Sequence, residues 1–128
     1  MTELHYELCE QCEKNMMESG AMTSIDELIE TQAEMDFGTA ISILKDGYKV
    51  ARKGWNGKAM FIYMVKGSEP YADELRNEAL DHVAPLKEEG EKVKINAHID
   101  MRAADGSIVI GWLASQTDML AEDWVILS

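Results

Sequence analysis

The sequence predicts an α+β fold, in which one core helix packs on a small antiparallel β-sheet. Two observations predict it: apolar residues recur at helical spacing within 36–46, and beyond Gly47 short apolar runs alternate with turn signals. The chain has 128 residues, 46% hydrophobic and 28% charged, which is typical of a globular domain with its own core. We expect this domain to span 35–128, with an N-terminal acidic helical extension over 1–34 and an acidic helical insert over 67–91.

The helices are predicted from apolar spacing and capping residues. Residues 2–18 form an acidic amphipathic stretch, and Ser24 followed by Glu27 is a capping box that opens a short second helix. Asp36 is placed to cap the core helix, and Gly47 suits the position after its end, where left-handed backbone is common. The stripe of the core helix that we expect to be buried comprises Phe37, Ala40, Ile41 and Leu44.

The strands follow the core helix. Residues 48–52 and 60–65 are predicted as a hairpin, because Asn56-Gly57 between them is a strong two-residue turn signal. The nearly continuous apolar run in 60–65 indicates a central strand covered on both faces. Further strands are expected over 93–102, 107–112 and 124–127, with a tight turn at 104–106 and a loop or single helical turn over 113–123.

The insert is predicted as one surface helix. It is polar and acidic, and it ends near Pro85, which cannot continue a helix. Its apolar residues at helical spacing are Leu75, Ala79, Leu80 and Val83.

Charge narrows the range of partners. The chain carries 12 basic and 24 acidic residues, a net charge of −12, which disfavours binding to a nucleic-acid polymer or an anionic membrane surface. Residues 36–66 alone are net positive, at +4, so this is the first place to look for an anion site. On charge alone, a solvated strand edge carrying lysines is the favoured interpretation. With no apolar run long enough to span a bilayer and no secretory signal, a cytosolic protein is expected.

No cofactor, metal or catalytic residue is expected. His5 and the Cys9-x-x-Cys12 pair have metal-like spacing, but a structural zinc site needs four ligands. His82 and His98 are the only other histidines, and there is no second cysteine pair. No nucleophile elbow, Walker sequence or His-Glu-x-x-His motif occurs either.

Three tryptophans lie at predicted strand–loop junctions. Trp55 is in the turn beside Arg52, Trp112 ends a strand, and Trp124 begins one. An aromatic face at such a place stacks on a nucleobase for about 1–3 kcal/mol. The alternative is that all three rings are core anchors whose N–H groups are satisfied within the protein.

Two segments resemble the signatures of a known family. The opening segment, 35–58, contains Met35-Asp36-Phe37-Gly38-Thr39-Ala40 and Arg52-Lys53-Gly54-Trp55-Asn56-Gly57-Lys58. The closing segment, 111–124, reads Gly-Trp-Leu-Ala-Ser-Gln-Thr-Asp-Met-Leu-Ala-Glu-Asp-Trp. Both are similar to the Thoeris anti-defence two proteins, and the resemblance covers 35–66 and about 95–127. Residues 1–34 and the longer insert depart from the short members of that family.

The resemblance implies a phage-encoded sponge that acts in the cytoplasm of the infected bacterial host. Such proteins bind, without cleaving, cyclic nucleotide signals made by bacterial immune enzymes. The signals include a cyclised ADP-ribose isomer made by TIR-domain proteins and, for some members, cyclic dinucleotides or trinucleotides. The resemblance also implies a homotetramer with ligand pockets at protomer interfaces.

Residues and resemblance together give a set of expected ligand contacts. Aromatic rings would stack on the base or a ribose, Arg52 would pair with phosphate oxygens, and polar side chains would read hydroxyls or base edges. Asp118 and Asp123 either accept ligand hydrogen bonds or brace the loop, and Met60 and Met101 either line the pocket or belong to the core. The full set is Phe37, Gly38, Arg52, Trp55, Asn56, Gly57, Met60, Met101, Trp112, Ser115, Gln116, Thr117, Asp118, Asp123 and Trp124.

Two other classes of function stay open. An acidic protein–protein inhibitor, mimicking phosphate and using 1–34 as its contact, is motivated by the net charge of −12. A cyclic-nucleotide phosphodiesterase is the other, although the sequence offers it no credible metal cluster or nucleophile–base pair.

Overall fold

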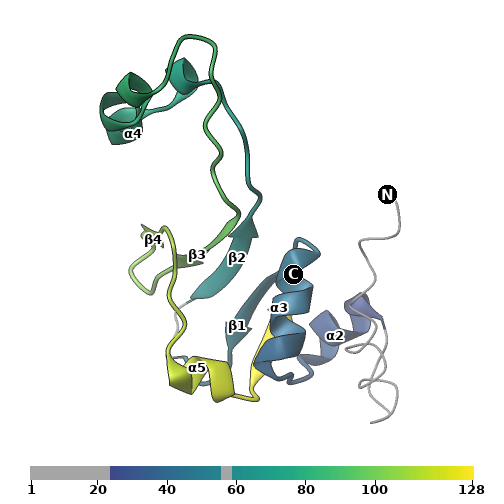
Figure 1. Ribbon diagram of the computed structural model, residues 1–128. Coiled ribbons are helices and arrows are strands. Elements are labelled where there is room, and N and C mark those ends of the chain that lie inside the picture. The colour runs from purple at the N-terminus through teal and green to yellow at the C-terminus, as the bar shows by residue number, and fades with distance from the viewer. Residues whose placement is uncertain (1–23, 56–58) are drawn as a thin grey trace. The chain divides into compact units, whose positions relative to one another are not determined.

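The computed structural model describes residues 24–55 and 59–128 (Figure 1). The described residues fall into two units: the sheet unit, which comprises the residues up to Met64 together with Ile99–Ser128, and the insert unit, Val65–His98. The expected helix over 2–18 and its cysteines lie outside the described residues, as does the Asn56-Gly57 turn. In the described part of the chain, no helix has both the length and the apolar character needed to cross a membrane.

The strands form one five-stranded antiparallel sheet in the order β4-β3-β2-β1-β5, which confirms the predicted α+β class. Strand β1 pairs with β2 through Val50 opposite Ile62, and with β5 through Val50 opposite Ile126. The last strand therefore lies beside the first, and the segments that precede β5 and follow β1 meet at one end of the sheet. The bounds are β1 Lys49–Arg52, β2 Phe61–Val65, β3 His98–Arg102, β4 Ile108–Val109 and β5 Trp124–Leu127.

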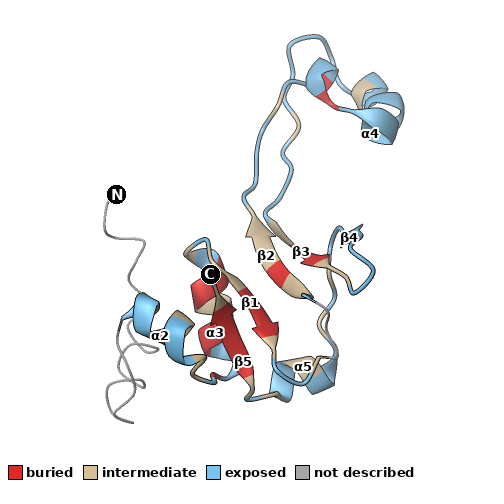
Figure 2. Ribbon diagram, turned by 180° about the vertical axis from the view of Figure 1, so that it is seen from behind, coloured by how far each residue is buried: buried red, intermediate tan, exposed pale blue. Residues whose placement is uncertain are grey.

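Helix α3, Phe37–Lys45, supplies the other layer of the core. It begins as predicted, since the Asp36 carboxylate accepts a hydrogen bond from Thr39 N at 2.8 Å, and it is followed by Gly47 at φ +98°. The helix packs against β1 and β5, where the buried residues concentrate (Figure 2). Ala40 and Leu44 are buried as predicted, whereas Phe37 and Ile41 are only partly buried.

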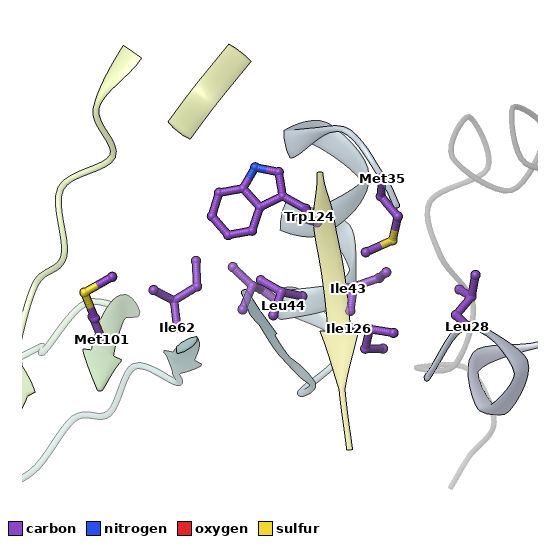
Figure 3. Packing of buried hydrophobic residues seen from close by; sticks show 10 residues of the cluster. Leu28, Met35, Ile43, Leu44, Ile62, Met101, Trp124 and Ile126 are labelled. Atoms are coloured by element: carbon purple, nitrogen blue, oxygen red, sulfur yellow. The ribbon is translucent and has the colours of Figure 1, made fainter. Parts of the chain in front are cut away.

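Ile43 is also fully buried, although the predicted stripe omitted it. It lies three residues after Ala40, and positions three and four apart share one face of a helix. Figure 3 shows Ile43 and Leu44 beside Ile126 and Trp124 in the core.

Helix α2, Ile25–Thr31, is confirmed together with its cap. Glu27 N donates to Ser24 Oγ at 3.2 Å, which satisfies one of the free N–H groups of the first turn. Leu28 is 1% exposed and belongs to the core cluster (Figure 3), and α2 contacts β5. The core thus extends upstream of residue 35, while the domain boundary itself stays a prediction.

Three expectations about strands are wrong in detail. The strand expected over 93–102 begins only at His98, because the residues before it belong to the insert unit. Strand β2 is central in the sheet order, but only Ile62 is fully buried, because α3 lies against β1 and β5 instead. The strand expected over 107–112 has just two residues in β4, because Gly111 at φ +80° turns the chain. The tight turn before β4 is confirmed, with Gly106 at φ +90° and its N–H bonded to Ala103 O at 2.9 Å.

The insert is not one helix. It holds three short pieces: η2 Ala72–Glu74, α4 Asn77–His82 and η3 Ala84–Leu86. Leu75 and Arg76 are extended, at ψ 160° and 155°, and they interrupt the helical pattern. Helix α4 ends before Pro85, as predicted, and Pro85 lies in the first turn of η3. The unit also reaches beyond the predicted 67–91, because residues 92 and 95 pair with residues 71 and 68 as isolated bridges.

Candidate functional site

Strand register sets up the candidate site. Arg52, the last residue of β1, pairs with Trp124, the first of β5. One residue further, Lys53 N donates to Asp123 O at 3.0 Å. The turn after β1, which holds Trp55, is therefore joined to the loop that leads into β5.

The three tryptophans form an indole cluster at this end of the sheet. Trp55 and Trp124 have ring centroids 5.3 Å apart at 78°, Trp55 and Trp112 are 6.3 Å apart at 71°, and Trp112 and Trp124 are 6.4 Å apart at 79°. All three pairs are edge-to-face, a favoured arrangement of aromatic rings. Trp124 is fully buried, and Trp55 and Trp112 are half-buried, so two of the three rings retain exposed surface.

Asp118, on the short helix α5, Gln116–Leu120, joins the indole cluster to the sheet. Its carboxylate oxygen Oδ1 accepts from Trp55 Nε1 at 3.2 Å and from Arg52 Nη1 at 2.9 Å. Its main-chain oxygen accepts from Trp124 Nε1 at 3.0 Å. Its own N–H is bonded to Ser115 Oγ at 3.1 Å, which caps α5.

Asp123 completes what we call the Arg52 clamp, made of Arg52, Gly54, Asp118 and Asp123. Its carboxylate accepts from Arg52 Nε at 2.9 Å and Nη2 at 3.5 Å, and also from Gly54 N at 2.8 Å. A Cβ at Gly54 would lie 2.8 Å from Asp123 Oδ2 and 3.1 Å from Arg52 Nη2, so a larger residue here would displace the side chains of the clamp. Sequence reasoning missed Gly54, since glycine is common in turns of every type and does not by itself indicate a close approach.

The clamp is an electrostatic unit in which one guanidinium is shared by two carboxylates. The hydrogen bonds that Arg52 donates to Asp123 and then to Asp118 raise the pKa of Arg52 above its ordinary value. The pKa of Asp123 is lowered, chiefly by its bond to Arg52. Burial pushes the pKa of Asp118 upward, but the bonds from Arg52, Trp55 and Ser115 outweigh burial, and the net shift is downward. Both aspartates are therefore ionised at neutral pH.

This constellation of residues lies within a recognised domain. The sequence signature described as the Thoeris anti-defense 2-like domain matches residues 35–127. The chain belongs to the Thoeris anti-defense 2-like family. It is also 39% identical, over 97 residues, to "Thoeris anti-defense 2" of Bacillus phage SP01, and the match covers 76% of this chain and 99% of that relative. The predicted resemblance is confirmed, and residues 1–34 lie outside the family match.

Four of the expected ligand residues are held within the protein by hydrogen bonds or burial. Asp118 and Asp123 brace the loop, which is one of the two roles predicted for them, and Arg52 donates to both. Trp124 is a core residue with its N–H satisfied, which is the alternative role predicted for the tryptophans. Direct ligand contact by these four residues stays a prediction.

The remaining expected residues are distributed as follows. Met101 is 9% exposed and belongs to the core cluster, and Met60 and Phe37 are partly buried against it. Asn56 and Gly57 lie outside the described residues. Exposed positions near the start of α3 and α5 hold Gly38, Ser115, Gln116 and Thr117.

Asp100 on β3 is a further polar residue that sequence reasoning did not select. Its side chain is buried, and Oδ1 accepts from Gly111 N at 3.0 Å. Trp112, which follows Gly111, donates its main-chain N–H to Ile99 O at 2.7 Å. These bonds fix the backbone that carries the second half-exposed indole.

Apolar side chains are exposed on the segments that flank Trp112. Within residues 108–120, six large hydrophobic side chains are at least 42% exposed. They are Ile108, Val109, Ile110, Leu113, Met119 and Leu120. No group of three or more His, Cys, Asp or Glu side chains placed to hold a metal ion occurs within 24–55 and 59–128.

Proposed function

We propose that this protein binds a cyclic nucleotide signal of bacterial immunity and sequesters it without cleaving it. The observation that carries the proposal is the pair of half-exposed indoles, Trp55 and Trp112, anchored on the buried Trp124 beside exposed polar residues of α5. Membership of the Thoeris anti-defense 2-like family supports an anti-defence role, exercised in the cytoplasm of an infected bacterium.

The proposed ligand is a cyclised ADP-ribose isomer made by TIR-domain proteins, and cyclic dinucleotides or trinucleotides are further candidates. The adenine of such a ligand stacks on Trp55 or Trp112, each stack contributing about 1–3 kcal/mol. The exposed Ser115, Gln116 and Thr117 offer hydroxyl and amide groups for ribose hydroxyls and base edges.

The phosphates require a positive charge that is free to turn to them. Arg52 is already bonded to two carboxylates, so a phosphate would have to compete with both. Lys53 lies two residues before Trp55 and, among the described residues, forms one exposed ion pair, with its Nζ 3.2 Å from Glu34 and side-chain exposures of 46% and 50%. An exposed pair of this kind contributes only about 0–1 kcal/mol. We therefore assign the phosphate contact first to Lys53 and second to Arg52.

Assembly is part of the proposal. A cluster of exposed apolar side chains, such as those within 108–120, is typical of a protein–protein interface. In the homotetramer that we propose, partner copies cover these side chains, and the ligand pockets lie at the protomer interfaces. Static light scattering on the purified protein measures the mass of the assembly and tests this point.

The mechanism is mass action. A sponge must hold the free signal below the level that its effector detects, which demands nanomolar affinity, about −12 kcal/mol. Preorganisation favours such affinity because fewer side chains need ordering when the ligand binds. The clamp and the indole cluster supply that preorganisation in the sheet unit.

The test is depletion and release. Protein and the purified cyclised ADP-ribose isomer are mixed, the free ligand is measured, and the protein is then denatured by heat. We expect depletion before heating and recovery of the intact ligand afterwards. Absence of depletion with this ligand and with cyclic oligonucleotides would refute the proposal, and recovery of a cleaved product would favour a phosphodiesterase instead.

A separate deletion distinguishes the sponge from an acidic inhibitor that acts through its N-terminal segment. Because Leu28 lies in the core, the deletion must stop at residue 23. A sponge lacking 1–23 still depletes the signal, whereas an inhibitor that depends on this acidic segment loses its activity.

A further inference from the structure

We propose that Asp118 is a positioning residue that sets the orientation of the Trp55 indole for ligand binding, an inference that rests on the proposed function. Its carboxylate oxygen bonds the indole N–H at 3.2 Å and the Arg52 guanidinium at 2.9 Å. Asp118 would thus act on the ligand through Trp55, without touching it.

The carboxylate is itself held from two sides. The Asp118 N–H is bonded to Ser115 Oγ, which fixes the residue on the first turn of α5. Arg52 is bonded in turn to Asp123, whose carboxylate also accepts from Gly54 N. A carboxylate fixed by its own backbone and by an anchored guanidinium gives the Trp55 N–H a rigid acceptor.

The ring orientation of Trp55 depends on the Asp118 carboxylate more than the ring orientation of Trp124 does. Trp124 is 0% exposed, so core packing fixes its ring, and its N–H bonds the main-chain oxygen of Asp118. Trp55 is only half-buried, and its ring contacts Trp112 and Trp124 by edges. Because packing holds the ring on one side only, it does not fully fix the rotation of the Trp55 side chain. The hydrogen bond to Asp118 supplies a second restraint.

The orientation of Trp55 determines the shape of the exposed surface. At 71° to each other, the exposed parts of Trp55 and Trp112 form a corner, and a base stacks there on the ring surface that the edge-to-face contact leaves free. If Trp55 rotates, this corner is lost and must be rebuilt when the ligand binds, which lowers affinity.

The chain contains its own control, because Asp118 bonds the two indoles through different atoms. A side-chain substitution removes the acceptor of Trp55 and leaves the main-chain acceptor of Trp124. Asp118→Asn keeps an oxygen for the Trp55 N–H but loses the charge that faces Arg52. Glu122→Ala, at an exposed position of the same loop, removes a carboxylate that lies outside the clamp.

The first measurement needs no ligand. Nuclear magnetic resonance of ¹⁵N-labelled full-length protein resolves one indole N–H signal for each of the three tryptophans. In Asp118→Ala we expect the Trp55 signal to shift and to exchange faster with solvent, while the Trp124 signal stays within the range seen in Glu122→Ala. In Asp118→Asn the Trp55 signal stays closer to wild type. An unmoved Trp55 signal in folded Asp118→Ala overturns the inference.

The second measurement is calorimetric titration with the purified cyclised ADP-ribose isomer. We expect about tenfold weaker binding by Asp118→Ala, a smaller loss in Asp118→Asn and none in Glu122→Ala. In the Trp55→Phe background, which has no indole N–H, Asp118→Ala should add little further loss. Equal losses in both backgrounds would overturn the inference and leave the sponge intact. If the wild-type protein does not bind, the proposed function fails, and the Trp55 signal alone decides whether Asp118 orients the ring.

Discussion

The sheet unit and the insert unit are held together in different ways. In the sheet unit, α3, β1 and β5 bury a continuous cluster that includes Trp124, Ile126 and Val50, each 0% exposed. In the insert unit, the buried hydrophobic residues among those described are Ala72 and Leu75 alone. Backbone hydrogen bonds join segments of this unit that are far apart in the chain, such as Val93 N to Pro70 O at 2.8 Å.

The difference shows where a rigid binding surface can be built in this chain. Burial of apolar surface is the dominant stabilising contribution, whereas a single hydrogen bond contributes about 0.5–1.5 kcal/mol net. Segments with few buried contacts open locally at lower free energy than the rest of a domain. The indole cluster and the clamp are on the sheet unit, next to its best-packed strands, and this is the unit suited to a preformed site.

The largest effect is expected from replacing Trp124, which belongs both to the core and to the indole cluster. Trp124→Ala should lower the free energy of unfolding by about 3–5 kcal/mol, because it leaves a cavity beneath the other indoles. The measurement is chemical denaturation followed by circular dichroism. Leu75→Ala, a buried leucine of the insert unit, is the matched control and should shift the midpoint much less. Equal shifts would mean that the two units unfold as one.

The next effect concerns binding. Trp112→Ala should weaken affinity for the cyclised ADP-ribose isomer by about 5- to 150-fold, since one stack is worth about 1–3 kcal/mol. The fold should survive because Trp112 is only half-buried. Tyr71→Ala removes a 47% exposed ring from the insert unit and should leave affinity unchanged. Unaltered calorimetric affinity in folded Trp112→Ala would contradict the assignment of the site.

A smaller effect is expected from pH. The folded-state pKa values of Asp118 and Asp123 lie below their usual value of 3.8, so the unfolded chain takes up protons first as pH falls. Stability from these groups is complete above pH 5 and is lost as pH drops below about 4. The denaturant concentration at the midpoint of unfolding should therefore decrease as the pH is lowered from 5 to 3. Asp123→Asn should show a shallower fall than wild type, and an identical pH profile would mean that the clamp does not contribute to this acid sensitivity.

The smallest effect concerns helix caps. Asp36→Ala should cost about 1 kcal/mol, because Thr39 N loses its acceptor at the start of α3. Helix α4 has no side-chain cap, so Arg76→Ala should change stability by less than about 0.5 kcal/mol. Thermal denaturation of both variants compares the caps directly. Equal costs would indicate that Arg76 makes a stabilising contact of another kind.

Local chemistry made part of this protein readable from its sequence. The caps at Ser24 and Asp36, the left-handed Gly47 and the turn at Gly106 depend on residues a few positions apart, and each is confirmed. The strands of the sheet and the family resemblance were likewise readable, because alternating apolar runs and signature residues are properties of the chain itself.

Only the tertiary structure shows which charged side chains pair with one another and which tryptophan rings are buried. Arg52 lies 66 and 71 residues from Asp118 and Asp123, and only the pairing of β1 with β5 reveals that it is held by both. The same pairing buries one tryptophan and leaves two half-exposed, a distinction that no local pattern contains. Strand pairing over long separations depends on the whole core. For that reason the sequence left two roles open for the aspartates and the tryptophans, and only the structure shows that Asp118 and Asp123 brace the loop and that Trp124 is buried.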